Sequence, residues 1–285
     1  MVRALIATFA LFMASANAPA KSTQPSTPKL RTTSLSVPSP LNSSPAEDRH
    51  AELHLLDLAN LARQQAGVGR LQEDGGLTQA ALAHAQAMAA SQQLSHQFSG
   101  EPALAERLAI TTNLHLDRAG ENVAYAATID RVQAVLMASL PHRENLLNPV
   151  FNVAGFAVVR SGETLYVTED FGHRLPTYSA QASAAMLSNS LNQVRQQKGL
   201  GTLEMLSAAG AQSSACAMAN AGSIDIPVPR ASYVIRYTTI EPQSLPASAM
   251  KALLDPGVHG YSVGSCYGRS SGYPNGAYWM VLLLY

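Results

Sequence analysis

The chain has 285 residues, of which 47% are hydrophobic, so it holds enough apolar sequence for one large or two modest packed domains and is not disordered throughout. Nineteen basic and nineteen acidic residues cancel, and only 13% of all residues are charged. No net field would draw the protein to nucleic acid or to an anionic membrane surface, so we expect no nucleic-acid partner.

The first 46 residues have the composition of an export signal followed by a tether. Arg3 precedes an apolar stretch that ends in small residues, which predicts a signal peptide over residues 1–18. That stretch is far shorter than the ~20 apolar residues of a membrane-spanning helix, and no other segment is apolar enough to span. Residues 19–46 are rich in Ser, Thr and Pro and are predicted to be a linker. We therefore expect a secreted or periplasmic protein with no transmembrane segment after signal removal.

The spacing of apolar residues then predicts helices and one strand pair. Helices are expected over residues 47–65, 77–92, 101–110 and 129–140. Strands are expected over 153–159 and 164–171, joined by a turn at 161–163. Helices that flank a small antiparallel sheet are typical of an α+β domain, which we place at residues 47–175.

Residues 176–285 repeat parts of this pattern in a shorter form. Five residues of the first helical region have counterparts at the same spacing: Asn60, Arg63, Gly67, Gly69 and Leu71 match Asn192, Arg195, Gly199, Gly201 and Leu203. Further on, Leu146-Leu147-Asn148-Pro149 matches Leu253-Leu254-Asp255-Pro256. Matches in the same order favour a degenerate internal duplication, which predicts a second, shortened α+β domain.

The two cysteines, Cys216 and Cys266, both fall in this second part. Two cysteines are too few for a disulfide scaffold but suit an oxidising compartment. A bridge between them would close a loop of about 51 residues and add about 4 kcal/mol in the chain-entropy model. Two separate buried thiols are the alternative.

Two imidazoles and one carboxylate stand out as a candidate site, in the strings Ser95-His96, Gly120-Glu121-Asn122 and Pro141-His142-Arg143. Histidine and glutamate serve as metal ligands and as proton-transfer groups. Two His and one Glu with an open fourth position match the ligand set of a catalytic zinc site. Each residue also has a structural interpretation, because His96 can end a helix, Glu121 can cap a turn and His142 can lie in a first helical turn.

Several strings occur together in one order, namely Asn60-x-x-Arg63-x-x-x-Gly67, Ser95-His96, Gly120-Glu121-Asn122, Pro141-His142-Arg143-x-Asn145-Leu146-Leu147 and a strand pair that contains Gly155. This set resembles the CAP superfamily of cysteine-rich secretory, antigen 5 and pathogenesis-related (SCP-like) proteins, above all its compact bacterial branch. The resemblance implies an α–β–α sandwich with a cleft in which His96, Glu121 and His142 face one another. Members have been credited with divalent-metal binding, lipid or sterol binding and hydrolysis, so the fold alone implies no single chemistry.

The sequence also departs from the fuller family pattern. Eukaryotic relatives usually carry a Trp and, three residues later, a second cleft Glu, where this chain has Leu136 and Ser139. The resemblance therefore implies a three-ligand site for zinc or another divalent metal, with Ser139, Arg143 and Asn145 at the cleft rim. A Ser139-His142-Glu121 nucleophile is disfavoured, because no nucleophile elbow accompanies it.

The shortened second part lacks all three candidate ligands. By the nearest matched strings Glu121 aligns with Tyr233 and His142 with Ala249, while the stretch around His96 is deleted. This loss favours a functional site over a structural one. The leading hypothesis is a divalent-metal or small-ligand binding module. One alternative is a metal-assisted hydrolase with Glu121 as the general base, and another is a lipid or protein-partner module that ignores the three residues.

Overall fold

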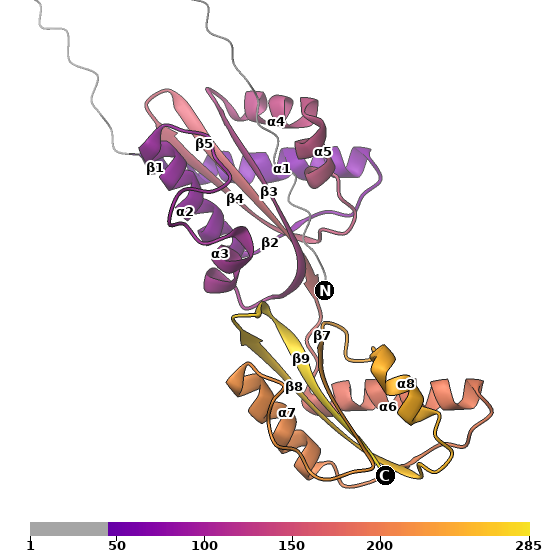
Figure 1. Cartoon of the computed structure of the whole chain (residues 1–285). Coiled ribbons are helices and arrows are strands. Elements are labelled where there is room, and N and C mark those ends of the chain that lie inside the picture. The colour runs from indigo at the N-terminus through magenta and orange to yellow at the C-terminus, as the bar shows by residue number, and fades with distance from the viewer. Residues whose placement is uncertain (1–44) are drawn as a thin grey trace, which may run out of the picture. The chain divides into compact units, whose positions relative to one another are not determined.

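The computed structural model describes residues 45–285 (Figure 1). The predicted signal peptide and nearly all of the predicted linker lie outside the described residues. Ala46, the last residue of the predicted linker, already belongs to a two-residue strand, β1 (Ala46–Glu47), which pairs antiparallel with β4. The folded part therefore begins slightly before the expected boundary at residue 47.

Residues 45–175 contain the predicted helices and hairpin together with strands that the sequence did not predict. The helices are α1 (Arg49–Gln65), α2 (Gly75–Ser91), α3 (Leu104–Thr111), α4 (Ile129–Ala138) and α5 (Leu140–Leu146). The other strands are β2 (Gln72–Glu73), β3 (His115–Ala126), β4 (Val153–Ser161) and β5 (Thr164–Leu175). The helix expected over 129–140 ends at Ala138, because Ser139 is extended and Pro141 starts the next helix.

The sheet has the strand order β1-β4-β5-β3, with β2 parallel to β4, and helices cover both of its faces. One face packs on α1, α4 and α5 through a cluster that includes Phe156, Val167 and Phe171. The other face packs on α2 and α3 in clusters around Ala157 and Val153 (Figure 1). The predicted α–β–α sandwich is confirmed. Since neighbouring strand residues point to opposite faces, β3 directs Glu121 toward α2 and α3 and Asn122 toward α5.

Two local features fix α2 against this sheet. The Asp74 carboxylate accepts hydrogen bonds from the N–H groups of Gly76 and Leu77, both at 3.0 Å, and so caps the helix. Gly155 on β4 lies directly below the first turn, where a Cβ atom would come within 2.0 Å of the Thr78 nitrogen. Only glycine permits this close approach, which sets the height of α2 above the sheet.

Arg63 connects α1 to the chain that leads into β4. Its buried guanidinium donates to the carbonyl oxygens of four residues, at 2.6 to 3.0 Å: Gly69, Leu146, Asn148 and Phe151. In the second part, Arg195 donates in the same way to Gly201 and Leu253 at 2.8 and 2.7 Å. The arginine of the repeated string thus organises loop backbone in both places.

Residues 176–285 form a smaller α+β arrangement around a four-stranded sheet of order β6-β8-β9-β7. Its helices are α6 (Ala180–Gln197), α7 (Ala209–Ala221) and α8 (Met250–Leu253), with a 3₁₀ turn at Ala247–Ala249. Its strands are β6 (Glu204–Met205), β7 (Tyr233–Thr239), β8 (Gly260–Ser270) and β9 (Tyr273–Leu284). The short parallel strand β6 pairs with β8 as β2 pairs with β4, and β7 flanks β9 as β3 flanks β5.

The predicted disulfide is confirmed. Cys216 on α7 and Cys266 on β8 are bridged, with Cα atoms 4.9 Å apart and a sequence separation of 50. No free cysteine occurs in residues 45–285. The bridge ties α7 to the sheet it covers.

Candidate functional site

The three predicted site residues come from three elements that meet at the edge strand β3. His96 lies in the loop after α2, Glu121 on β3 and His142 in the first turn of α5. The Nδ1 atom of His96 is 2.9 Å from Oε1 of Glu121. The His96 and His142 rings have centres 6.5 Å apart and planes inclined by 31°. The structure therefore brings all three residues together.

Their exposure differs sharply. The His96 side chain is 60% exposed, whereas the Glu121 carboxylate is 5% exposed. His142 is half-buried, and burial together with the nearby His96 lowers the pKa of its imidazole. His142 thus stays neutral, and able to offer a lone pair, to a lower pH than an ordinary histidine.

The second oxygen of Glu121 is held by Arg107 of α3, whose guanidinium donates to Oε2. Arg107 also donates to Oε1 of Glu101 at 2.9 Å, and that oxygen lies 2.7 Å from Nδ1 of the buried His84. The other ring nitrogen of His84 is 2.7 Å from the carbonyl oxygen of Ser95. A chain of polar contacts therefore runs from the Ser95 carbonyl through His84, Glu101 and Arg107 to Glu121.

Sequence reasoning missed His84, Glu101 and Arg107. For His84 on α2 and Arg107 on α3, the available signal was a polar or charged residue at a helix position that faces the sheet. His84 is completely buried within an alanine-rich helix, and Arg107 is 7% exposed. A buried charge needs a partner, so these positions mark a polar network once the helix faces are known.

Two further carboxyl groups lie beneath the site on β5. Asp170 pairs in register with Glu121, is fully buried and makes no hydrogen bond through either oxygen among the described residues. Burial and the adjacent Glu121 charge raise the pKa of Asp170 well above its ordinary value. On the opposite face, burial raises the pKa of Glu169 to about 7, although Asn122 donates to its Oε2 at 2.9 Å.

The predicted rim residues lie in or next to α5, and two of them donate hydrogen bonds to backbone carbonyl oxygens. Asn145 donates to the carbonyl oxygen of Glu121 at 3.2 Å and to Oδ1 of Asn122 at 3.1 Å. Arg143 donates to the carbonyl oxygen of Met137 at 3.0 Å and so closes the α4–α5 turn. Ser139 is the residue between these helices, and its hydroxyl does not cap α5.

The donor set does not form the three-ligand metal site that the sequence suggested. Within residues 45–285, no group of three or more His, Cys, Asp or Glu side chains is arranged to hold a metal ion. The physical reason lies at Glu121, because one of its oxygens faces His96 and the other is paired with Arg107. Each oxygen of Glu121 therefore already has a partner, and the side chain is only 5% exposed. The two imidazoles are the more accessible donors.

Comparison with known proteins now places this site in a family. The model of the cysteine-rich secretory protein (CAP) family matches residues 56–171, which include β3, α5 and the β4–β5 hairpin. Residues 56–171 form a CAP-family domain. His96, Glu121 and His142 all lie inside this CAP domain.

Three of the similar proteins come from bacteria. The uncharacterized protein YkwD of Bacillus subtilis is 32% identical over 123 residues, which are 42% of this chain and 47% of that protein. An extracellular SCP-domain protein of Bacillus anthracis is 26% identical, with a TM-score of 0.40 over 45% of this chain and 41% of that one. An outer surface protein of Borrelia burgdorferi is 17% identical, with a TM-score of 0.42 over 46% of this chain and 98% of that one. The chain thus spans about half the length of the curated relative it matches.

The second sheet, formed by β6, β8, β9 and β7, can be compared with the CAP-domain sheet residue by residue. Gln72 opposes Val153 and Glu204 opposes Gly260, which fixes the correspondence between the two sheets. On this register the pair Glu121–Asp170 corresponds to the pair Val234–Leu283, and Glu169 corresponds to Leu282. The counterpart of Glu121 is therefore Val234, one residue beyond the Tyr233 expected from sequence strings.

The helices match with a different offset, because the strand register makes Ser262 the counterpart of Gly155, whereas the glycine that lies under α7 is Gly264. The buried positions of α2 and α7 coincide when Leu77 and Ala211, which lie over these two glycines, are matched. His84 then corresponds to Met218. Aliphatic or thioether side chains occupy the positions that hold His84, Glu121, Glu169 and Asp170 in the CAP domain. A sheet of this topology therefore forms without the polar groups.

Proposed function

We propose that this protein is an exported binding protein whose CAP domain presents His96 and His142 to a divalent cation, with zinc as the first candidate. One observation carries the proposal. The Glu121 carboxylate faces Nδ1 of His96, which assigns the proton to that nitrogen and leaves the Nε2 lone pair free to bind a cation, on a ring whose centre is 6.5 Å from that of His142. Glu121 is then a positioning residue for His96 rather than a ligand.

The ring separation sets how far the site must close. A metal bound through a ring nitrogen at about 2 Å lies about 3 Å from the ring centre, so two rings in tetrahedral positions have centres about 5 Å apart. The observed 6.5 Å separation requires His96 to move toward His142 by about 1.5 Å. His96 is in an exposed loop and can make this movement, while water or a ligand fills the other positions.

The buried network favours binding over catalysis by Glu121. A general base must reach its proton and have a pKa near the working pH. The Glu121 side chain is only 5% exposed, and its two oxygens face Arg107 and His96, which leaves little access for a water molecule. The hydrolase alternative therefore has less support than cation binding.

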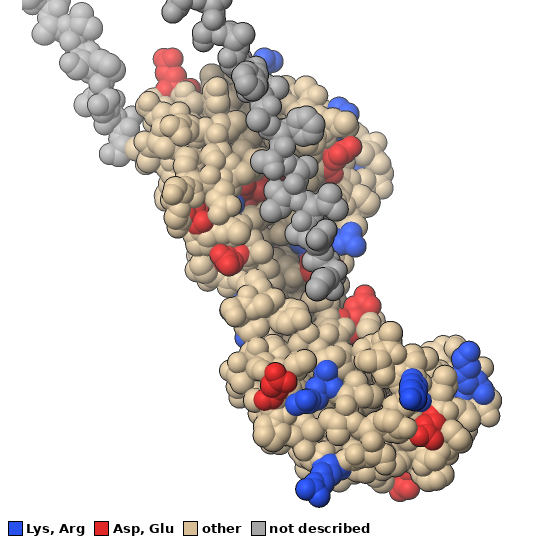
Figure 2. Space-filling view, in the orientation of Figure 1, with Lys and Arg blue, Asp and Glu red and all other residues tan. Residues whose placement is uncertain are grey.

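Export is supported by the disulfide between Cys216 and Cys266, since such bridges persist in oxidising compartments. None of the helices in residues 45–285 is long and apolar enough to cross a membrane. On the face shown in Figure 2, acidic and basic side chains are interspersed and form no large patch of one sign. This surface fits an uncharged or small charged ligand better than a polyanion.

Zinc titration by calorimetry tests the proposal. We expect saturable binding that is abolished in His96→Ala and in His142→Ala. Glu121→Gln keeps a hydrogen-bond acceptor but loses the charge, and should weaken binding by about tenfold or more without changing the stoichiometry. His54→Ala is the matched control, because His54 is a 47%-exposed histidine on α1.

The result that rejects the proposal is equally specific. Zinc binding that is absent, or that has the same affinity in His96→Ala and the parent protein, would exclude the imidazole pair as the site. Thermal unfolding of each variant in parallel separates loss of the site from loss of the fold.

A further inference from the structure

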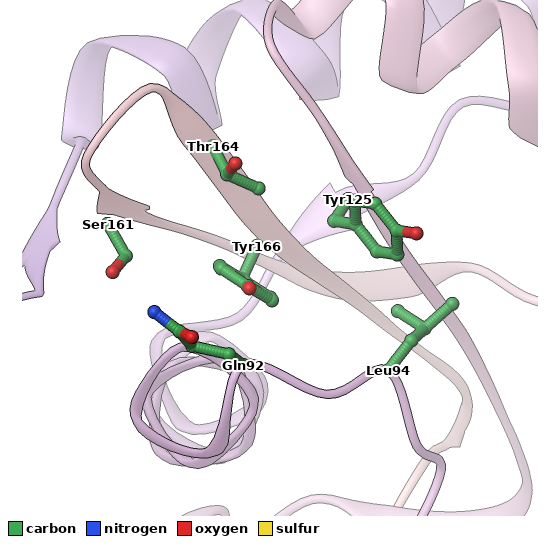
Figure 3. Close-up of a pocket in the computed structure, with 6 residues that line it drawn as sticks. All are labelled: Gln92, Leu94, Tyr125, Ser161, Thr164 and Tyr166. Carbon is green, nitrogen blue, oxygen red and sulfur yellow. The ribbon is translucent and has the colours of Figure 1, made fainter. Parts of the chain in front are cut away.

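A separate pocket opens in the CAP domain at the end of α2 (Figure 3). It has a volume of about 520 Å³ and is lined by Gln92, Leu94, Tyr125, Ser161, Thr164 and Tyr166. Figure 3 shows residues of the β4–β5 hairpin on one side and residues of the segment after α2 on the other. No lining side chain is charged at neutral pH. The pocket therefore suits a neutral ligand and neither a cation nor a phosphate.

The aromatic part of the pocket is a pair of tyrosines that oppose each other across β3 and β5. Tyr125 and Tyr166 have ring centres 6.1 Å apart and planes inclined by 37°. Tyr166 is 7% exposed and belongs to the core, whereas Tyr125 is 57% exposed. An open aromatic ring supported by a buried one offers a firm apolar face to a ligand.

The polar part consists of groups whose hydrogen-bonding capacity is unused. The amide of Gln92 and the hydroxyls of Ser161, Thr164, Tyr125 and Tyr166 take part in no hydrogen bond between described residues. In Figure 3 the Gln92 nitrogen is turned toward Ser161. Amides and hydroxyls can both donate and accept, so together they can bind a ligand rich in hydroxyl groups.

The backbone at Gln92 gives an independent reason to assign a function to the pocket. Gln92 ends α2 with φ +53°, and among the described residues it is the only non-glycine residue with positive φ. The residue that ends α7 in the same left-handed conformation is Gly222. Glycine would avoid the strain, so retaining a glutamine there makes sense when its side chain is needed in the pocket.

A second pocket lies at the end of α7, next to the second sheet, although the elements around it differ. A pocket of about 510 Å³ includes Gly222, Thr238, Tyr273 and Trp279. Thr238 and Trp279 form the cross-strand pair that corresponds to Tyr125 and Tyr166. Here α7 is one turn shorter than α2, and Tyr273 comes from the start of β9 to lie 5.8 Å from Trp279. The aromatic pocket is thus present in both sheets, whereas the Glu121 network is present in one.

We infer that the pocket at the end of α2 binds a neutral saccharide unit. A pyranose ring has a C–H face that packs on an aromatic ring and hydroxyls around its rim that need hydrogen-bond partners. Tyr125 supplies the stacking face, and Gln92, Ser161 and Thr164 supply the hydrogen bonds. This binding is independent of the His96–His142 pair.

Calorimetry with neutral tetrasaccharides of glucose, mannose and N-acetylglucosamine tests this inference, with a chelator present so that cation binding does not contribute. At least one tetrasaccharide should bind saturably. Tyr125→Ala should raise its Kd by about tenfold or more. Gln92→Gly relieves the backbone strain, so it should weaken binding without lowering the thermal unfolding temperature.

Two controls make the outcome decisive. Tyr178→Ala removes a tyrosine that is 36% exposed outside the pocket and should leave the affinity unchanged, as should His96→Ala. The inference is overturned if no neutral tetrasaccharide binds at millimolar concentration. It is also overturned if Tyr125→Ala and Gln92→Gly bind as tightly as the parent protein, or if only an acidic polysaccharide binds.

Discussion

Replacing Glu169 by glutamine is expected to stabilise the protein at neutral and alkaline pH. The Glu169 side chain is fully buried in the sheet, and its single hydrogen bond comes from Asn122 at 2.9 Å. Its other oxygen has no partner among the described residues. Glutamine has the same shape, can still accept from Asn122 and carries no charge to be desolvated.

The magnitude follows from the pKa. Burial raises the pKa of Glu169 from 4.5 to about 7, and each pKa unit corresponds to about 1.4 kcal/mol. Because the folded state holds the proton more tightly than the unfolded state, this group favours folding fully below pH 4.5. Its contribution falls by about 3 kcal/mol as the pH rises to about 7 and then stays constant. Glu169→Gln should remove this decline.

Urea unfolding at about pH 5 and about pH 8, followed by far-UV circular dichroism, measures the effect. Fluorescence is less suitable, because the single tryptophan, Trp279, lies outside the CAP domain. The gain in unfolding free energy of Glu169→Gln should grow between the two pH values by up to about 3 kcal/mol. Glu163→Gln in the exposed β4–β5 turn is the control and should show no such change. A stability difference for Glu169→Gln that is the same at both pH values would refute the reasoning.

Three other predictions concern stability and titration. Lysine can replace only part of the four carbonyl contacts of Arg63, so Arg63→Lys should lower the free energy of unfolding in urea by about 3 kcal/mol. Arg195 makes two such contacts, so Arg195→Lys should lower it less, and equal losses would contradict this reasoning. Reduction of the Cys216–Cys266 bridge should lower the free energy of unfolding by about 4 kcal/mol. A urea midpoint that is the same with and without reductant would contradict this. The His142 imidazole should titrate below pH 6.5 by NMR and shift upward in His96→Ala, since burial and His96 together lower its pKa; a midpoint that does not move would show that His96 exerts no such effect.

The helices that lie on the sheet could be predicted from the sequence because each buries one face. Apolar residues at helical spacing identified α1, α2 and α4, and two apolar runs on either side of the turn at 161–163 identified the β4–β5 hairpin. Strand β3 was missed for a physical reason. Like β4, it is buried on both faces from Glu121 to Ala124, but Glu121 and Asn122 interrupt the continuous apolar run that marks such a strand.

For the candidate site, too, one part could be predicted from the sequence and another part only from the tertiary structure. The sequence by itself determined the two imidazoles and the carboxylate, because the strings around His96, Glu121 and His142 resemble those of a family and are missing from the second part of the chain. Only the tertiary structure decided what each group does. It pairs Glu121 with Arg107 and places Asp170 beneath it, contacts that depend on strand register and on how α3 packs against the sheet.

The two sheets of this chain show why such contacts cannot be derived from local sequence. The same topology accepts Glu169 and Asp170 in one sheet and Leu282 and Leu283 in the other. Periodicity and glycine positions determine the fold, because they control which faces can be buried and how closely helices approach the sheet. The charge of a buried group and its partners depend on side chains that lie far apart in sequence, and these meet only after the fold has formed.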